Sequence, residues 1–91
     1  MYRLHPGIVA VTMVSQVERA FGMTIRRRRH RLKLSQEDFA EKADVHRTYI
    51  SSVELGKVSV GIGVAYKLAG ALGIPLSRLL QEAEREVDTK R

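Results

Sequence analysis

The sequence contains no cysteine and no tryptophan, and only two prolines and five aromatic residues among its 91 residues. Without cysteine there can be no disulfide framework and no zinc site built on thiolates, and the absence fits a reducing cytoplasm. The three histidines, His5, His30 and His46, lack the spacing of metal ligands. We therefore expect one small domain that binds neither a metal nor another cofactor.

A hydrophobic run long enough to cross a bilayer is also missing. The apolar stretch Ile8–Val14 is short, Thr12 interrupts it, and no small-residue cleavage site follows it. We expect a soluble, non-exported, cytoplasmic protein. Three interpretations of Ile8–Val14 stay open: an extension of the first helix, an arm that contacts a partner, or a segment without a selected role, upstream of a usual start at Met13.

The sequence shows none of the residue patterns that catalysis requires. Serine, histidine and aspartate all occur, but nothing in their spacing suggests a triad, and there is no pair of catalytic carboxylates. A glycine-rich loop that could hold a phosphate is absent as well. We therefore expect that the protein is not an enzyme.

Negative charge is scarce in the first third of the chain, and the net charge of +6 suggests an anionic partner. Residues 34–91 hold eight lysines and arginines against nine acidic residues, so the excess lies before them. It consists mainly of Arg26, Arg27, Arg28, Arg29, Arg31 and Lys33. Such a run on a helix can be an ordinary solvated face, or it can attract phosphates.

The most informative stretch is Ser35–Gly56, which predicts two short helices joined by a tight corner. Ser35 is a good N-cap, with acidic residues in the turn that follows it. The corner is expected at 43–45, because Asp44 tolerates left-handed backbone geometry. The second helix should run from about Arg47 to residue 55 and end at Gly56. Its outer face is short, polar and able to form hydrogen bonds.

This stretch resembles the helix-turn-helix of the Cro/C1 (XRE-like) repressor family. The matching features are Ser35-Gln36, Ala40, Val45, Ile50-Ser51, Glu54 and Gly56, and the resemblance runs from about residue 21 to residue 80. A narrower similarity joins residues 46–51, followed by Val53-Glu54, to the small controller proteins of restriction–modification systems. The resemblance implies an all-α fold of five helices that binds double-stranded DNA and regulates transcription.

The helix boundaries follow from caps and apolar periodicity. A capping box at Ser15–Glu18 predicts a first helix from residue 15 to about residue 31 or 32, with Val17, Phe21, Ile25 and Leu32 on its buried stripe. Fourth and fifth helices are expected at 62–72 and at about 76–86. We divide the chain into an N-terminal arm or helix extension (1–14), the domain (15–87, with the motif at 35–56) and a frayed end (88–91).

The resemblance also implies an internal ion pair. Members of the family commonly carry an arginine at the position of Arg29, paired with a glutamate at the position of Glu54. The pair would join the first helix to the third; the alternative is that Arg29 is merely solvated. Lys33 departs from the family, which usually has glycine there to end the first helix, so that helix end is left open.

The resemblance further suggests which residues contact DNA. Arg47 is the best candidate for reading a base, because arginine can bind guanine O6 and N7 with two hydrogen bonds. The other expected base contacts are Thr48 and Ser52. The expected contacts to the DNA backbone are Gln36, Tyr49, Ser51, His46 and Lys57, to which the basic run of the first helix adds Arg26 and Arg28. Gln36 would also brace the recognition helix, His46 could instead cap it, and Tyr49 could instead pack against the motif.

A homodimer on a palindromic operator is the expected assembly, with Leu76, Leu80, Ala83 and Val87 of the fifth helix as its interface. Ile8–Val14 could add to that interface, and RNA polymerase is kept as a further candidate partner. The alternative function is a protein-interaction or antitoxin-like module that keeps the fold with weak or no DNA binding. The weak charge of residues 34–91 supports it, as do apolar Leu55 and Val58 in a loop where many relatives carry arginine or asparagine.

Overall fold

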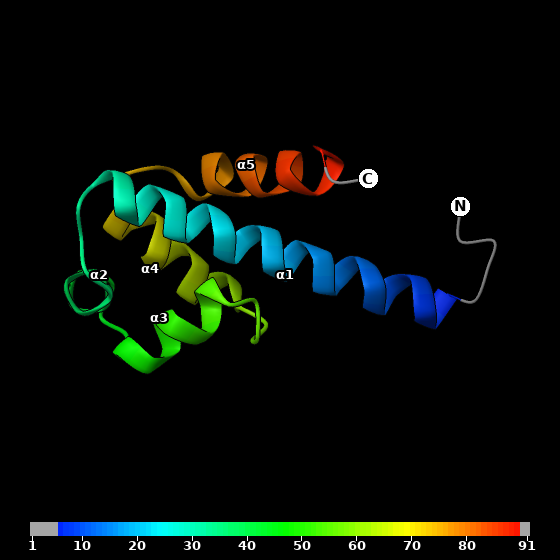
Figure 1. Ribbon diagram of the computed structural model, residues 1–91, viewed down its shortest axis with the longest axis horizontal. Coiled ribbons are helices and arrows are strands. Elements are labelled where there is room, and N and C mark those ends of the chain that lie inside the picture. The colour runs from blue at the N-terminus through cyan, green and yellow to red at the C-terminus, as the bar shows by residue number, and fades with distance from the viewer. Residues whose placement is uncertain (1–5, 90–91) are drawn as a thin grey trace.

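The structure, a computed structural model, describes the backbone of residues 6–89 and the side chains of residues 16–87. Over this range the chain forms five helices and no strand, as the sequence predicts (Figure 1). They are α1 (Pro6–Arg31), α2 (Gln36–Ala43), α3 (Arg47–Glu54), α4 (Ile62–Leu72) and α5 (Leu76–Thr89). No helix within residues 6–89 is both long and apolar enough to cross a membrane.

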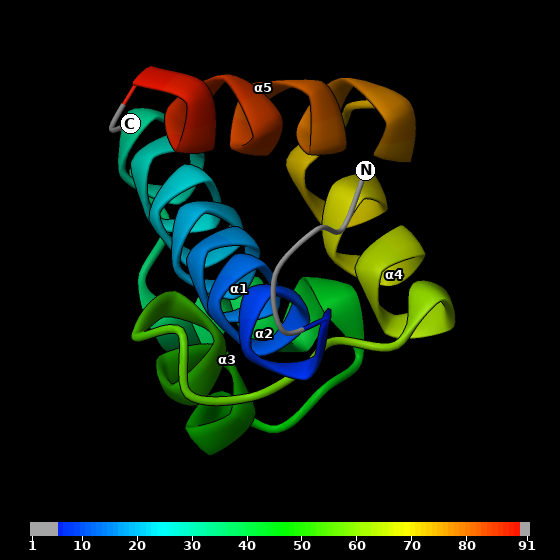
Figure 2. The ribbon, with the colours of Figure 1, turned by 90° about the vertical axis from the view of Figure 1, so that its right-hand side faces the viewer.

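The long helix α1 organises the fold. It contacts α3, α4 and α5, while α2 packs on α3 and α4 (Figures 1 and 2). In Figure 1, α5 lies on one side of α1 and the α2–α3 pair lies on the other. Neither α2 nor α3 makes extensive contact with α5, so α1 connects these two regions. The core between the helices is formed by Ala20, Phe21, Ile25, Phe39, Ala40, Ala43, Ile50, Val53, Ala65, Leu68, Ala69, Leu72, Leu79 and Ala83.

The first helix does not start at the capping box of Ser15; of the alternatives left open for residues 8–14, the structure shows the helix extension. Helix α1 begins nine residues earlier, at Pro6, and passes through Ser15 without a break. Proline suits the first helical position because its φ is already helical and it has no N–H to satisfy there. No further proline follows to stop the helix, so residues 8–14 extend α1. Their side chains lie outside the described range, and their contact with a partner stays a prediction.

The other helix ends follow the predicted caps closely. Helix α4 has the predicted bounds, and Gly73 ends it with a left-handed φ of 76°. Helix α3 ends at Glu54, one residue early. Helix α5 continues to Thr89, so two of the residues expected to fray are helical, and 90–91 lie outside the described residues. Lys33 adopts a left-handed φ of 59°, which is why glycine suits this position.

The predicted apolar stripe of the first helix is only partly buried, and α5 also leaves apolar surface exposed. On α1, Phe21 and Ile25 are buried, but Val17 is 42% exposed and Leu32 is 50% exposed. Leu32 follows the last residue of α1, Arg31, and so lies beyond the helix that carries the stripe. On α5, Leu79 is fully buried, whereas Leu80 is 41% exposed. These exposed apolar side chains are surface that the single chain does not cover.

Candidate nucleic-acid interface

The corner between α2 and α3 fixes how α3 is presented. The Ser35 hydroxyl accepts a hydrogen bond from the Asp38 N–H at 3.0 Å and caps α2. Asp44 ends α2 with a left-handed φ of 57°, and the next N–H, of Val45, donates to the Ala40 carbonyl at 3.0 Å. The chain thereby reverses within three residues and enters α3. This is the predicted corner, with aspartate in the conformation expected of it.

Helix α3 has one buried face and one open face. Ile50 and Val53 are fully buried against the rest of the core. On the other side of the helix, Arg47 and Thr48 are exposed. Ser51 and Ser52, which follow on the same face, are half-buried. The structure therefore brings all three expected base-reading residues to the solvent side of one eight-residue helix.

Helix α3 is capped by His46. The Nδ1 atom of His46 accepts a hydrogen bond from the Thr48 N–H at 3.2 Å. This is the capping role expected of His46 as one of its two alternatives. Tyr49 is partly buried and packs against the core, which is also one of its two predicted alternatives. Lys57 and Arg26 are exposed and lie outside the core.

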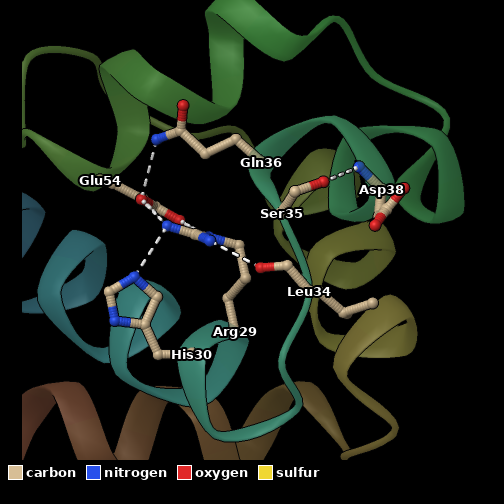
Figure 3. Close-up of polar contacts among 7 residues, drawn as sticks. All are labelled: Arg29, His30, Leu34, Ser35, Gln36, Asp38 and Glu54. Carbon is tan, nitrogen blue, oxygen red and sulfur yellow. Dashed lines mark hydrogen bonds and ion pairs between the residues drawn. The ribbon is translucent and has the colours of Figure 1, made fainter.

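A buried ion pair fastens α3 to α1. Arg29 Nε donates to Glu54 Oε2 at 2.7 Å and Arg29 Nη2 to Glu54 Oε1 at 3.0 Å, with both side chains almost fully buried (Figure 3). The remaining guanidinium hydrogen bonds go to the Leu34 carbonyl at 2.7 Å and to His30 Nε2 at 3.2 Å. Because each side chain has charged or polar partners, burial leaves none of the pair's hydrogen-bonding groups without a partner.

Helix α2 joins this network through Gln36. Its side-chain amide Nε2 donates to Glu54 Oε1 at 3.1 Å, so Glu54 accepts from residues of both α1 and α2 (Figure 3). Glu54 is the last residue of α3. The network therefore sets the C-terminal end of the recognition helix relative to both neighbouring helices, and Gln36 braces that helix as the resemblance implied.

Gly22 also positions α3, a role that the sequence patterns above do not predict. A Cβ atom at Gly22 would lie 2.1 Å from the Val53 carbonyl oxygen and 2.9 Å from the Glu54 carbonyl oxygen. Only glycine lets the last carbonyls of α3 approach the backbone of α1 this closely. The available signal was a glycine near the middle of a 26-residue helix. Glycine destabilises a helix interior, so its presence there indicates a position that requires its small size.

Two neighbouring arginines face the other way, toward α5. Arg27 Nη2 pairs with Glu86 Oε1 at 2.8 Å, and Arg28 Nε donates to Glu82 Oε1 at 3.0 Å. The Arg28 guanidinium makes a second, short contact to Glu82. Its hydrogen bonds, aided by its positive charge, lower the pKa of the Glu82 carboxyl below its ordinary value. The same contacts raise the pKa of Arg28.

Arg28 is therefore a poor candidate for a phosphate contact. Its charge is compensated by Glu82, and it lies on the α5 side of α1 rather than on the α3 side. The expectation that Ala83 supplies dimer surface is wrong, because Ala83 belongs to the core and is only 1% exposed. Of the other expected interface residues, Leu80 is exposed, while Leu76 and Val87 are partly buried.

The sequence can be compared with known families once this geometry is established. The sequence model of the helix-turn-helix family matches residues 25–79, which is more than half of the chain. The chain belongs to this family. It is 38% identical over 74 residues to the control protein C.MunI of a Mycoplasma species, a match that covers 80% of this chain and 100% of that protein. It is 36% identical over 69 residues to the control protein C.BamHI of Bacillus amyloliquefaciens, covering 75% and 85%.

Solved structures agree with these sequence relatives. The restriction–modification controller protein C.AhdI of Aeromonas hydrophila superposes with a TM-score of 0.65 at 36% identity, covering 67% of this chain and 92% of that one. The clp gene regulator ClgR of Corynebacterium glutamicum superposes with a TM-score of 0.77 at 24% identity, covering 81% and 79%, and supports the fold alone. The chain is thus a helix-turn-helix transcription regulator related to controller proteins.

Proposed function

We propose that this protein binds a specific double-stranded DNA operator as a homodimer and regulates transcription from it. The observation that carries the proposal is the open face of α3, where Arg47 and Thr48 are exposed and Ser52 follows one turn later. Such side chains can donate and accept hydrogen bonds along the base edges of a major groove. The buried face of the same helix is held by core packing and by the Arg29–Glu54 pair.

The reading residues take different roles in this proposal. Arg47 binds a guanine through O6 and N7, and Thr48 binds a neighbouring base edge or a thymine methyl group. Ser52 reaches a base or a sugar. The proposed backbone contacts are Gln36, Tyr49, Ser51, His46 and Lys57, together with Arg26 from the basic run of α1. Arg28 is left out because Glu82 compensates its charge.

Two copies are needed because one recognition helix covers little DNA. Eight helical residues span roughly 12 Å, which corresponds to only about three or four base pairs. Two symmetry-related copies would read half-sites about one helical turn apart on a palindromic or pseudopalindromic operator. The proposed interface centres on Leu80, which lines an apolar groove between α1, α4 and α5 together with Val17, Ile62 and Leu76.

The relatives suggest which genes are regulated. Two are control proteins and one is a restriction–modification controller protein, and the first of them is matched over its whole length. We propose that this chain likewise controls genes of a restriction–modification system. RNA polymerase would be a second partner if the protein activates transcription as well as repressing it.

Selection from random duplex DNA, at a stated salt concentration, tests the proposal. We expect the full chain to enrich one motif with two-fold symmetry, and its affinity for that duplex to fall steeply as salt increases. Sedimentation of the complex should show two protein chains on each duplex. If the chain enriches no sequence and binds no duplex at low salt, the proposal is overturned in favour of a protein-interaction module.

A further inference from the structure

Leu55 is an apolar side chain on the open face of the recognition helix. It is 58% exposed, and it follows α3 directly. Its backbone is still helical, with φ −87° and ψ −3°, and its N–H donates to the Ser51 carbonyl at 3.1 Å. Leu55 therefore continues the periodicity of α3 by one residue before Gly56 turns the chain away with a φ of 72°.

The helical periodicity sets which residues share a face with Leu55. It lies seven residues after Thr48, four after Ser51 and three after Ser52, and these spacings return to the same side of a helix. The buried residues Ile50 and Val53 occupy the opposite side. Leu55 thus extends the row of reading side chains with a group that cannot form a hydrogen bond.

An isolated exposed leucine would need no explanation. Leu55 differs from an isolated exposed leucine in two respects. A row of hydroxyl side chains lies on the same face of the helix, and Lys57, two residues further on, is an exposed cation that can bind a phosphate. The only apolar group that a base pair presents in the major groove is the 5-methyl group of thymine. An exposed leucine on a groove-facing surface matches that group in chemistry.

Building on the proposed function, we propose that Leu55 determines specificity by packing on the 5-methyl group of one thymine in each half-site. Thr48 and Leu55 are separated by roughly 10 Å along the helix, or about three base-pair steps. Leu55 therefore extends the sequence that one α3 reads beyond the bases bound by Arg47 and Thr48. The preferred operator should carry a thymine at this place.

Removal of single methyl groups tests the proposal. In the selected operator duplex, each thymine is replaced in turn by deoxyuridine, which keeps the hydrogen-bonding edge and loses only the methyl group. Dissociation constants are measured for the wild type and for Leu55→Ala. We expect the wild type to lose roughly four-fold in affinity per half-site at one thymine, the factor given by burial of one methyl group. Leu55→Ala should bind the unmodified operator more weakly and lose nothing further at that thymine.

Leu32→Ala is the matched control, because Leu32 is 50% exposed and lies at the end of α1 rather than on α3. This variant should keep the wild-type dependence on every methyl group. If Leu55→Ala also keeps that dependence, or if no thymine methyl affects wild-type binding, the thymine contact is overturned while the proposed function stands. A wild type that binds no duplex overturns both.

Discussion

The two sides of α1 are both held by arginine–glutamate pairs, yet the pairs differ in kind. Toward α3, Arg29 and Glu54 are almost fully buried and make two hydrogen bonds to each other. Toward α5, Arg27 is 43% exposed in its pair with Glu86, and the side chains of Arg28 and Glu82 are 17% and 20% exposed. Three consecutive arginines thus make one buried anchor and two contacts that remain partly exposed.

The difference shows that surroundings, and not charge alone, decide what an arginine does. Water and salt screen the surface pairs, which stabilise a fold by little. The buried pair is unscreened, and loss of either partner leaves a charge without compensation. Among the side chains of residues 16–87, no buried nitrogen or oxygen atom lacks a hydrogen-bond partner. The anchor toward α3 is therefore complete, and removal of one member should be costly.

The largest expected effect comes from breaking the buried pair. Glu54→Ala should lower the free energy of unfolding by about 3–5 kcal/mol, because Arg29 is left buried and unpaired. Glu82→Ala, the matched change on the α5 side, should cost at most about 1 kcal/mol. Urea unfolding followed by circular dichroism measures both. Equal losses in the two variants would remove the distinction between the two sides of α1.

A double change sharpens the same comparison. Arg29→Met combined with Glu54→Leu replaces the charged pair with apolar side chains of similar size, and buried pairs replaced in this way often keep their stability. We expect the double variant to recover much of the loss seen in Glu54→Ala. If the losses of the two single variants simply add, the side chains do not act as a pair.

Gly22→Ala should have the next largest effect. The new methyl group would meet the α3 carbonyls, so α3 must move away from α1, at a cost of about 1–3 kcal/mol or more. Gly70→Ala is the control, because a Cβ on this exposed glycine of α4 meets no atom within 4 Å. It should stabilise the protein by about 0.5–1 kcal/mol. A Gly22→Ala protein as stable as Gly70→Ala would show that α1 and α3 need no close approach.

The smallest expected effect is the pH dependence of the Arg28–Glu82 pair. The pKa of Glu82 is lowered in the folded protein, chiefly by its hydrogen bonds from Arg28. The pair therefore stabilises the protein above the carboxyl pKa of the unfolded chain, and this contribution is lost as pH falls through the folded pKa. The difference in unfolding free energy between wild type and Glu82→Gln should shrink from pH 7 toward about pH 2. A difference that stays constant with pH would contradict the assignment.

Much of the fold follows from local signals in the sequence. Ser35, Gly73 and Asp44 occupy the cap and corner positions that their chemistry favours, so the ends of α2 and α4 could be predicted. The start of α1 could not be predicted, because the local capping-box pattern at Ser15 is also compatible with a helix that continues through it. Nor does apolar periodicity reveal where a helix ends or which of its residues a neighbouring helix covers, and Val17 and Leu32 are more exposed than expected.

The candidate site shows the same division. The open face of α3 could be read from periodicity alone, and Arg29 and Glu54 from the family pattern. The partners of Arg28 depend on where α5 crosses α1, which is a tertiary contact between residues 54 positions apart. The role of Gly22 could not be predicted, because it depends on the α3 carbonyl oxygens that a Cβ atom at this position would meet. Only the tertiary structure shows how close those atoms lie.

The central claim is that the open face of α3 reads sequence while charge elsewhere supplies general attraction. Binding of Arg47→Ala and Arg47→Lys to the selected operator and to its single-base variants tests it most directly. We predict that Arg47→Ala costs about 1–3 kcal/mol per half-site and relaxes specificity at one guanine, with little loss on unrelated duplexes. Arg47→Lys should recover only part of the loss, because lysine lacks the planar fork. Equal weakening on all duplexes, with full recovery by lysine, would contradict the claim.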